Sequence, residues 1–294
     1  MLNQVEIDYY HSNGYIAVEN VLSVEEIADL QRVTDEFVEK SREVAAHDDV
    51  FDLEPGHSSQ APRVRRIKNA AIHHSVYDRT LRNDRILDIV EQLIGPGVSH
   101  NGHKLNMKYP KFGSPVEWHQ DWAFYPHTND RLLAVGVAID DMLFENGCLM
   151  VIPTSHKGRI FNHHQNGAFV GAVTDANFEP NDAVPIEVKS GGISIHHVRT
   201  LHGSAQNVSD KPRRLLLLQY CAVDAWPLVK PPDWHDFAAL VLRGKTTNQP
   251  HMTAVPVRMP YPQGARTGTI YELQSQLEQR IFRVNKADAG GAAG

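Results

Sequence analysis

A histidine and a carboxylate stand two positions apart near the middle of this 294-residue chain, and a second histidine follows far downstream. They are His119 and Asp121, within Trp-His-Gln-Asp-Trp, and His202, within Leu-His-Gly-Ser. In a β-strand, residues i and i+2 point to the same face, so His119 and Asp121 are expected to lie side by side. With His202 from a distant strand, they would form the two-histidine, one-carboxylate set that is typical of non-haem Fe(II) oxygenases.

An arginine, Arg213, lies eleven residues after the second histidine. A guanidinium is a planar fork of donors that matches the two oxygens of a carboxylate. On a strand close to His202, Arg213 is expected to bind the far carboxylate of a dicarboxylic co-substrate. Its neighbour Arg214 would point to the opposite face of that strand, and the spacing favours Arg213.

Aromatic residues surround the His-x-Asp segment and favour a metal pocket that contains little water. The chain has 17 histidines, so the spacing around His119, and not its residue type, carries the prediction. Neighbouring pairs such as His196 and His197 would point to opposite faces of a strand and are expected to be structural. The aromatic residues expected to contact a substrate are Trp122, Phe124 and Tyr125.

Residues 98–224 contain short β-like segments separated by Gly, Pro, Asn and Asp, which predicts a β-sandwich or barrel and not a βαβ fold. Residues 159–184 are too long for a tight turn and lack strong periodicity, so we expect an insertion over the mouth of the barrel. The segments that are predicted as strands are 98–110, 132–143, 147–153, 186–197 and 213–223.

The first 97 residues are expected to support this core with a strand and helices. A strand is predicted over 14–22, and a helix begins after Ser23, which forms a capping box with Glu26. A second helix is predicted over 84–94, where Gly95 and Pro96 end it. The polar segment 47–62 is predicted to be a mobile loop.

The residues after the core, 225–294, are Pro-rich and then partly helical. Small residues at 287–294 predict a disordered tail. We find no internal repeat and no linker long enough to separate two domains, so residues 1–294 are expected to form one domain.

The composition is that of an ordinary globular protein, with 41% apolar and 22% charged residues. A formal net charge of −6 argues against a nucleic-acid partner, which would need a basic face. Two cysteines without metal-binding spacing, Cys148 and Cys221, predict free thiols in a reducing compartment. No apolar stretch is long enough to span a membrane, and we expect a cytoplasmic protein.

Several motifs, in the correct order over residues 7–224, resemble the phytanoyl-CoA hydroxylase-like family of Fe(II)/2-oxoglutarate dioxygenases. They include a Lys-Tyr-Pro segment before the His-x-Asp motif and a nearly complete Glu-Asn-Gly-Cys-Leu-Met-Val-Ile-Pro-Thr-Ser-His segment that begins at Glu145. The distal motif of that family stands here as His202-Gly203-Ser204, and its co-substrate arginine falls on Arg213.

The resemblance implies a double-stranded β-helix, that is, a jelly-roll or cupin-like barrel, with N-terminal helices packed on one sheet. It implies that His119, Asp121 and His202 hold Fe(II), and that 2-oxoglutarate and O2 are co-substrates. 2-Oxoglutarate would chelate the metal and reach Arg213, with help from the Ser204 hydroxyl. Further candidates for contact with 2-oxoglutarate are Lys104, Asn106 and Lys68.

The expected reaction is hydroxylation of an aliphatic C–H bond in a small or medium, largely apolar molecule, while 2-oxoglutarate is decarboxylated to succinate and CO2. An acyl-CoA or a carrier-bound acyl chain is the alternative substrate, because a cationic run could receive its anionic tail. That run is otherwise a solvated loop or strand edge. It consists of Arg63, Arg65, Arg66 and Lys68.

Two other classes of protein remain open. One is a redox-inert zinc enzyme on a cupin-like barrel, although zinc sites often use three histidines and Arg213 would then have no purpose. The other is a non-catalytic barrel that binds a metabolite, although such a protein would have no reason to keep both iron and co-substrate groups. Desaturation or rearrangement would use the same iron site, and the oligomeric state is not readable from the residues.

Overall fold

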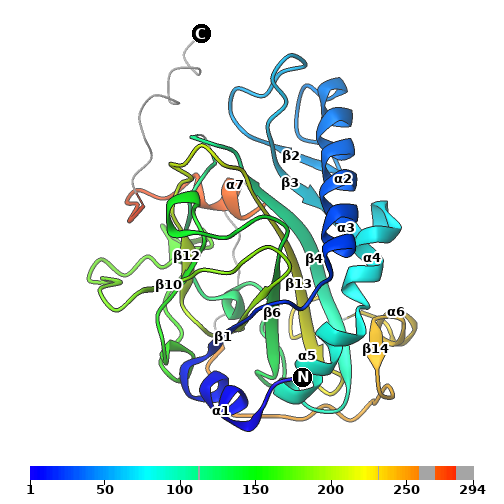
Figure 1. The fold of residues 1–294 in the computed structure, drawn as a ribbon. Helices are drawn as coiled ribbons and strands as arrows, with labels where there is room; N and C mark the ends of the chain where they lie inside the picture. The colour runs from blue at the N-terminus through cyan, green and yellow to red at the C-terminus, as the bar shows by residue number, and fades with distance from the viewer. Residues whose placement is uncertain (112, 231, 258–268, 283–294) are drawn as a thin grey trace.

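The computed structural model of the protein describes residues 1–111, 113–230, 232–257 and 269–282, and the tail predicted over 287–294 lies outside them. Most of the described strands belong to two antiparallel sheets that face each other (Figure 1). These sheets are the two layers of a jelly-roll, and they form an open sandwich instead of one closed barrel. The predicted β core with helical additions is confirmed.

The larger sheet has eight strands among the described residues, and every pair of neighbours in it is antiparallel. Its long central strands come from segments that are far apart in the sequence. The order across the sheet is β1 (Tyr15–Val18), β11 (Ile193–His197), β6 (Leu132–Ala138), β13 (Arg213–Ala222), β4 (Val98–Lys108), β3 (Val64–Lys68) and β2 (Phe51–Leu53), with β14 (Val241–Arg243) also paired to β4.

The smaller sheet has four short strands in the described part of the chain. Their order is β10 (Val184–Ile186), β7 (Leu149–Val151), β12 (His202–Ser204) and β5 (Val116–His119). The predicted insertion 159–184 contains a separate two-stranded hairpin of β8 (His164–Gln165) and β9 (Ala168–Phe169). Both sheets contribute side chains to a cavity between them.

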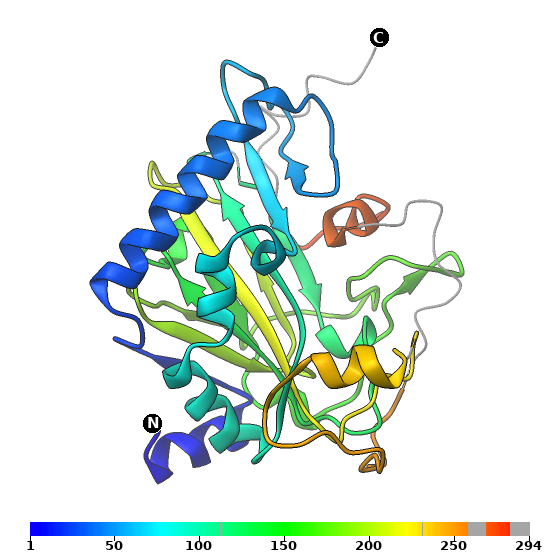
Figure 2. The ribbon, with the colours of Figure 1, turned by 90° about the vertical axis from the view of Figure 1, so that its right-hand side faces the viewer.

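Helices cover the outer face of the larger sheet, as Figure 2 shows from the side of α2 and α5. None of the described helices is both long and apolar enough to pass through a bilayer. The helices are α1 (Gln4–Asn13), α2 (Val24–Lys40), α3 (Ala70–His73), α4 (Ser75–Leu81), α5 (Asp84–Ile94), α6 (Trp234–Ala239) and α7 (Ile270–Gln274), with 3-10 turns η1 (Ser41–Glu43), η2 (Asp121–Ala123), η3 (Phe144–Asn146) and η4 (Ser155–Lys157).

Alternation along the strands gives the larger sheet two different faces. In β13, Leu216 packs in the main apolar core under the helices, whereas Leu215 lines the cavity between the sheets. In β4, Leu105 belongs to the same apolar core, whereas Lys104 and Asn106 line the cavity. Because neighbouring side chains of a strand point to opposite faces, the same strand can stabilise the fold and supply polar groups to the cavity.

The two predicted helices are confirmed as α2 and α5. The predicted strand 186–197 is wrong as a single strand. It contains the end of β10 and all of β11, and Gly191 turns the chain between them with a φ of 88°. Prediction missed α1, in which only Tyr10 is buried. It also missed β2, which lies inside the predicted loop 47–62 and is held there by pairing with β3.

The capping box of α2 gives a test of how the N-terminal segment is stabilised. The Ser23 hydroxyl accepts from the Glu26 amide at 3.2 Å, and the Glu26 carboxylate accepts from the Ser23 amide at 2.7 Å. Replacing Ser23 with Ala should lower the free energy of unfolding by about 1 kcal/mol, because a helix amide loses its acceptor. Urea unfolding measures this, with Ser59→Ala in an exposed loop as the control.

Candidate active site

Pairing between the two short strands β5 and β12 brings the predicted histidines together. His119 is the last residue of β5, and it lies directly opposite His202, the first residue of β12. Residues opposite each other in an antiparallel pair have side chains on the same face. The two imidazole centroids are therefore only 4.0 Å apart, although 82 residues of sequence separate them.

The carboxylate reaches the site by a different route from the one that was predicted. Asp121 is not a strand residue, because the chain leaves β5 at Gln120 and begins the 3-10 turn η2 at Asp121. The Gln120 side chain stabilises the chain where it leaves the strand, because its amide donates to the backbone carbonyls of Arg159 and Arg199 at 3.2 and 2.9 Å. The predicted proximity of His119 and Asp121 holds, but a turn and not strand alternation produces it.

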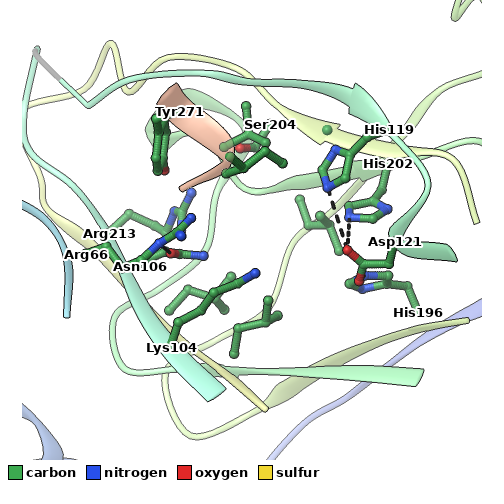
Figure 3. A pocket seen from close by; sticks show the side chains of 16 residues that line it. Arg66, Lys104, Asn106, His119, Asp121, His196, His202, Ser204, Arg213 and Tyr271 are labelled. Atoms are coloured by element: carbon green, nitrogen blue, oxygen red, sulfur yellow. Dashed lines mark hydrogen bonds and ion pairs between the residues drawn. The ribbon is translucent and has the colours of Figure 1, made fainter. Parts of the chain in front are cut away.

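The three side chains offer one compact set of metal ligands (Figure 3). Asp121 Oδ1 is 3.8 Å from His119 Nε2 and 4.0 Å from His202 Nε2. One ligand atom from each residue lies within 4.8 Å of the others, and each residue is only 5% exposed. An ion at the usual ligand distance of about 2 Å fits among these atoms.

Backbone carbonyls orient both imidazoles for metal binding. His119 Nδ1 donates to the carbonyl of Glu117 at 2.8 Å, and His202 Nδ1 donates to the carbonyl of Thr200 at 2.9 Å. This places the proton on Nδ1 and leaves the Nε2 lone pair of each ring directed at the Asp121 carboxylate. Hydrogen bonds of this kind fix the tautomer and the ring orientation of metal-binding histidines.

The protonation states also suit a metal ion. Burial lowers the pKa of His119 to about 4 and holds the pKa of His202 well below its ordinary value. Burial alone would raise the pKa of Asp121, but hydrogen bonding to His196 and the nearby imidazoles lower it well below its ordinary value. At neutral pH the set is two neutral imidazoles and one carboxylate, which is the form that binds a cation.

A third imidazole, that of His196 in β11, lies against Asp121 from its other side (Figure 3). His196 Nε2 is 3.5 Å from Asp121 Oδ2, while Oδ1 is the oxygen near the two ligand histidines. His196 is 1% exposed and lines the cavity. Sequence reasoning missed this contact, because strand alternation gives the face of His196 but not the loop that packs on it.

Arg213, the arginine that the spacing after His202 singled out, lies at the other end of the same cavity (Figure 3). It is 4% exposed, and its Nη2 donates to the carbonyl of Gly147 at 3.1 Å. Its Nε and Nη1 are buried and have no hydrogen-bond partner among the described residues. Because buried donors without a partner are rare, this guanidinium fits an acceptor on a molecule that enters the cavity, such as a carboxylate.

The other candidates for co-substrate contact divide into two groups. Lys104, Asn106 and Ser204 line the cavity. Lys68 is not part of its lining, because its ammonium donates to the backbone carbonyl of Asp48 at 2.5 Å. The structure therefore brings three of these four polar side chains to the site.

The aromatic residues predicted to contact substrate are not part of the cavity lining. Trp122 is buried in a separate apolar cluster, and its indole donates to the carbonyl of Pro256 at 2.8 Å. Phe124 packs edge-on against His119 with centroids 5.7 Å apart. The Tyr125 hydroxyl accepts from the Gln219 amide at 2.6 Å. These contacts support the site from outside.

Besides His196 and several apolar residues, the lining includes an arginine and a tyrosine that were not among the predicted site residues. Arg66 in β3 is 7% exposed and donates from Nε to Asn106 Oδ1 at 3.0 Å. Tyr271 in α7 packs over it, with the guanidinium carbon 5.3 Å from the ring centroid. The sequence showed Arg66 only as one member of a charged run. The structure separates it from Arg65, because Arg65 pairs with Glu54 while Arg66 lies across from Asn106 in the sheet.

Two facing sheets, a buried two-histidine, one-carboxylate set and an unsatisfied arginine in one cavity define a metal-dependent oxygenase with a carboxylate co-substrate. The family model for phytanoyl-CoA dioxygenase (PhyH) matches residues 10–215. The chain therefore belongs to the phytanoyl-CoA dioxygenase family.

Relatives with named activities support this assignment. The chain is 33% identical over 279 residues to the probable alpha-ketoglutarate-dependent hypophosphite dioxygenase of Stutzerimonas stutzeri, which covers 93% of this chain and 97% of that protein. It is 27% identical over 225 residues to the methylphosphonate hydroxylase of Gimesia maris, covering 76% and 82%. The crystal structure of EctD from S. alaskensis with bound Fe has the same fold, with a TM-score of 0.65, 24% identity and coverage of 88% and 89%.

The protein is accordingly a 2-oxoglutarate-dependent dioxygenase, and iron is its metal. The donor set and the unpartnered donors of Arg213 fit both groups. The zinc enzyme and the non-catalytic barrel are thereby set aside.

Metal removal should destabilise the folded protein, because an ion binds the native ligand set and not the unfolded chain. At a hundredfold excess over its Kd, Fe(II) should add about 2.7 kcal/mol to the free energy of unfolding. Anaerobic thermal unfolding with and without a chelator measures this. In His202→Ala, chelator and metal should leave the midpoint unchanged; an equal shift there would show that the ion binds elsewhere.

Loss of His196 should weaken metal binding without removing a ligand. We expect His196→Leu to reduce Fe(II) affinity roughly tenfold to a hundredfold, since groups that orient a metal ligand have effects of this size. Competition with a fluorescent chelator gives the affinity. His197→Leu, on the neighbouring strand position with the opposite orientation, is the matched control. Equal losses of affinity in both variants would contradict a positioning role for His196.

Proposed function

We propose that this protein inserts one oxygen atom of O2 into a C–H or P–H bond of a small substrate. The other oxygen atom would be incorporated into succinate, which forms together with CO2 when 2-oxoglutarate is decarboxylated. The observation that carries this proposal is the pair of unpartnered Arg213 donors in the cavity that also holds His119, Asp121 and His202. One cavity thus offers a ligand set for the metal and an anchor for a dicarboxylate.

Iron, when bound, supplies the activation of O2, and the protein's own groups determine what is positioned around it. His119, Asp121 and His202 would hold the ion and leave part of its coordination sphere open. Arg213 and the Ser204 hydroxyl would orient 2-oxoglutarate. The surrounding leucine and valine side chains of both sheets limit the entry of water, which strengthens these electrostatic contacts.

The substrates named for the relatives are the natural first candidates. The Stutzerimonas protein is named for hypophosphite and the Gimesia protein for methylphosphonate, and both molecules are very small. A small cavity between two sheets, lined at one side by Ile270 and Tyr271 of α7, suits molecules of this size. We expected a largely apolar substrate from Trp122, Phe124 and Tyr125, and the absence of these residues from the lining weakens the basis of that expectation.

A CoA-linked substrate has less support. It would need the cationic run at the mouth of the cavity to bind its phosphates. Arg65 is instead paired with Glu54 at 3.1 Å, Lys68 is bonded to a backbone carbonyl, and Arg66 is buried in the cavity. Because these three side chains are engaged or buried, they are not available to bind the phosphates of CoA.

An anaerobic titration with Fe(II) and 2-oxoglutarate tests the proposed co-substrate site. The wild-type protein should develop the visible metal-to-ligand charge-transfer band of the chelate. In Arg213→Ala, half-formation of the band should need roughly a hundredfold more 2-oxoglutarate, because a charge-assisted bidentate contact is lost. Succinate release with hypophosphite or methylphosphonate then screens for turnover.

Arg214→Ala is the matched control, since its guanidinium pairs with Asp140 at 2.7 Å instead of lining the cavity. It should keep the 2-oxoglutarate affinity of the wild type. A protein that binds Fe(II) but forms no band with 2-oxoglutarate would refute the proposed site.

A further inference from the structure

Lys104 is a cation in the active-site cavity without a partner of its own. It projects from β4 into the space between the Arg213 end and the Asp121 end (Figure 3). Its ammonium takes part in no hydrogen bond or ion pair with any described residue. Burial and the nearby Arg66 lower the pKa of Lys104 to about 8, against the opposing effect of the Asp121 carboxylate, which the metal would neutralise in the complete site.

The other cations of the cavity have counter-charges in the complete active site. Arg66 lies directly across from the buried carboxylate of Asp52 in the pairing of β3 with β2. Arg213 is the anchor for one carboxylate of 2-oxoglutarate. The two charges of Fe(II) would be balanced by Asp121 and by the second carboxylate of 2-oxoglutarate. One positive charge, that of Lys104, is left over.

An uncompensated charge in a cavity with little water is unfavourable, so an anionic group next to it gains binding energy. We infer that Lys104 binds an anionic group of the substrate, and that the protein acts on small oxyanions such as phosphorus oxyanions or carboxylates. This inference rests on the proposed function, since it assigns 2-oxoglutarate to Arg213.

The neighbours of Lys104 define the shape of this anion subsite. Leu217 lies opposite Lys104 in the pairing of β13 with β4, and Leu215 lies opposite Asn106. Both leucines line the cavity. They confine the anion to the space between the ammonium and the metal ligands, and the Asn106 amide, which accepts from Arg66, holds that arginine at the far end. A small anion with one reactive bond directed at the metal suits this space.

The alternative role for Lys104 is contact with 2-oxoglutarate, which was expected from the sequence. The two roles predict different effects of the same substitution. A substrate-binding lysine affects the affinity for the substrate anion and leaves the 2-oxoglutarate affinity unchanged. A co-substrate lysine affects both.

The experiment is an anaerobic titration of the Fe(II)·2-oxoglutarate protein with hypophosphite, methylphosphonate and acetate, followed through the charge-transfer band. We expect at least one of these anions to perturb the band of the wild type. Lys104→Met should lower the affinity for that anion roughly tenfold to a hundredfold, because a hydrogen-bonded charge is lost. Lys104→Arg should retain most of the affinity, and 2-oxoglutarate should bind Lys104→Met within about twofold of the wild-type affinity.

Lys157→Met, which removes an exposed positive charge outside the cavity, is the control for a general electrostatic effect. Thermal unfolding midpoints check that each variant is folded. The inference is overturned if no anion perturbs the wild-type band, if Lys104→Met binds the anion as well as the wild type does, or if it loses 2-oxoglutarate affinity to the same extent. Failure of the band itself would refute the proposed function instead.

Discussion

The antiparallel pairing of β12 with β5 is the constraint on which the active site depends. These short strands place His202 directly opposite His119, and a shift by one residue would turn His202 to the other face of the sheet. Gly203 permits β12 to lie close to β5, because a Cβ at this position would lie only 3.1 Å from the Val116 carbonyl oxygen and 3.3 Å from the Trp118 amide nitrogen. The backbone pairing of these two strands thus fixes the positions of both ligand histidines.

The larger sheet supplies the second half of the site through the alternation of its strands. One face of β4 and β13 packs under the helices in the main apolar core, and the other face carries Lys104, Asn106 and Arg213 into the cavity. The helices bury the apolar face, so the sheet is stable while its inner face stays polar. From the side of the smaller sheet, α7 is anchored by Gln274, which donates to the Gly171 carbonyl at 2.9 Å and accepts from the Glu117 amide at 2.9 Å.

Sequence patterns predicted those parts of the site that depend on short spacing. The His-x-Asp spacing, the distal His-Gly-Ser and the arginine eleven residues later indicated the groups that the structure brings into one cavity. Patterns failed where a residue's neighbours come from another element. Trp122 is an aromatic residue next to Asp121, yet its indole packs away from the cavity, because the turn η2 redirects the side chains that follow the motif.

The sequence by itself determined the class of chemistry, because ligand type and order along the chain are local properties, and two histidines with one carboxylate bind the same metals wherever they meet. It also determined the two helices α2 and α5 and the long strands of the core, since their apolar periodicity depends on residues that are close in the sequence. Only the tertiary structure decided that Arg66, Tyr271 and His196 belong to the site and that Lys68 does not. The physical reason is that burial and charge balance depend on contacts between elements that are distant in the sequence, and no local pattern encodes them.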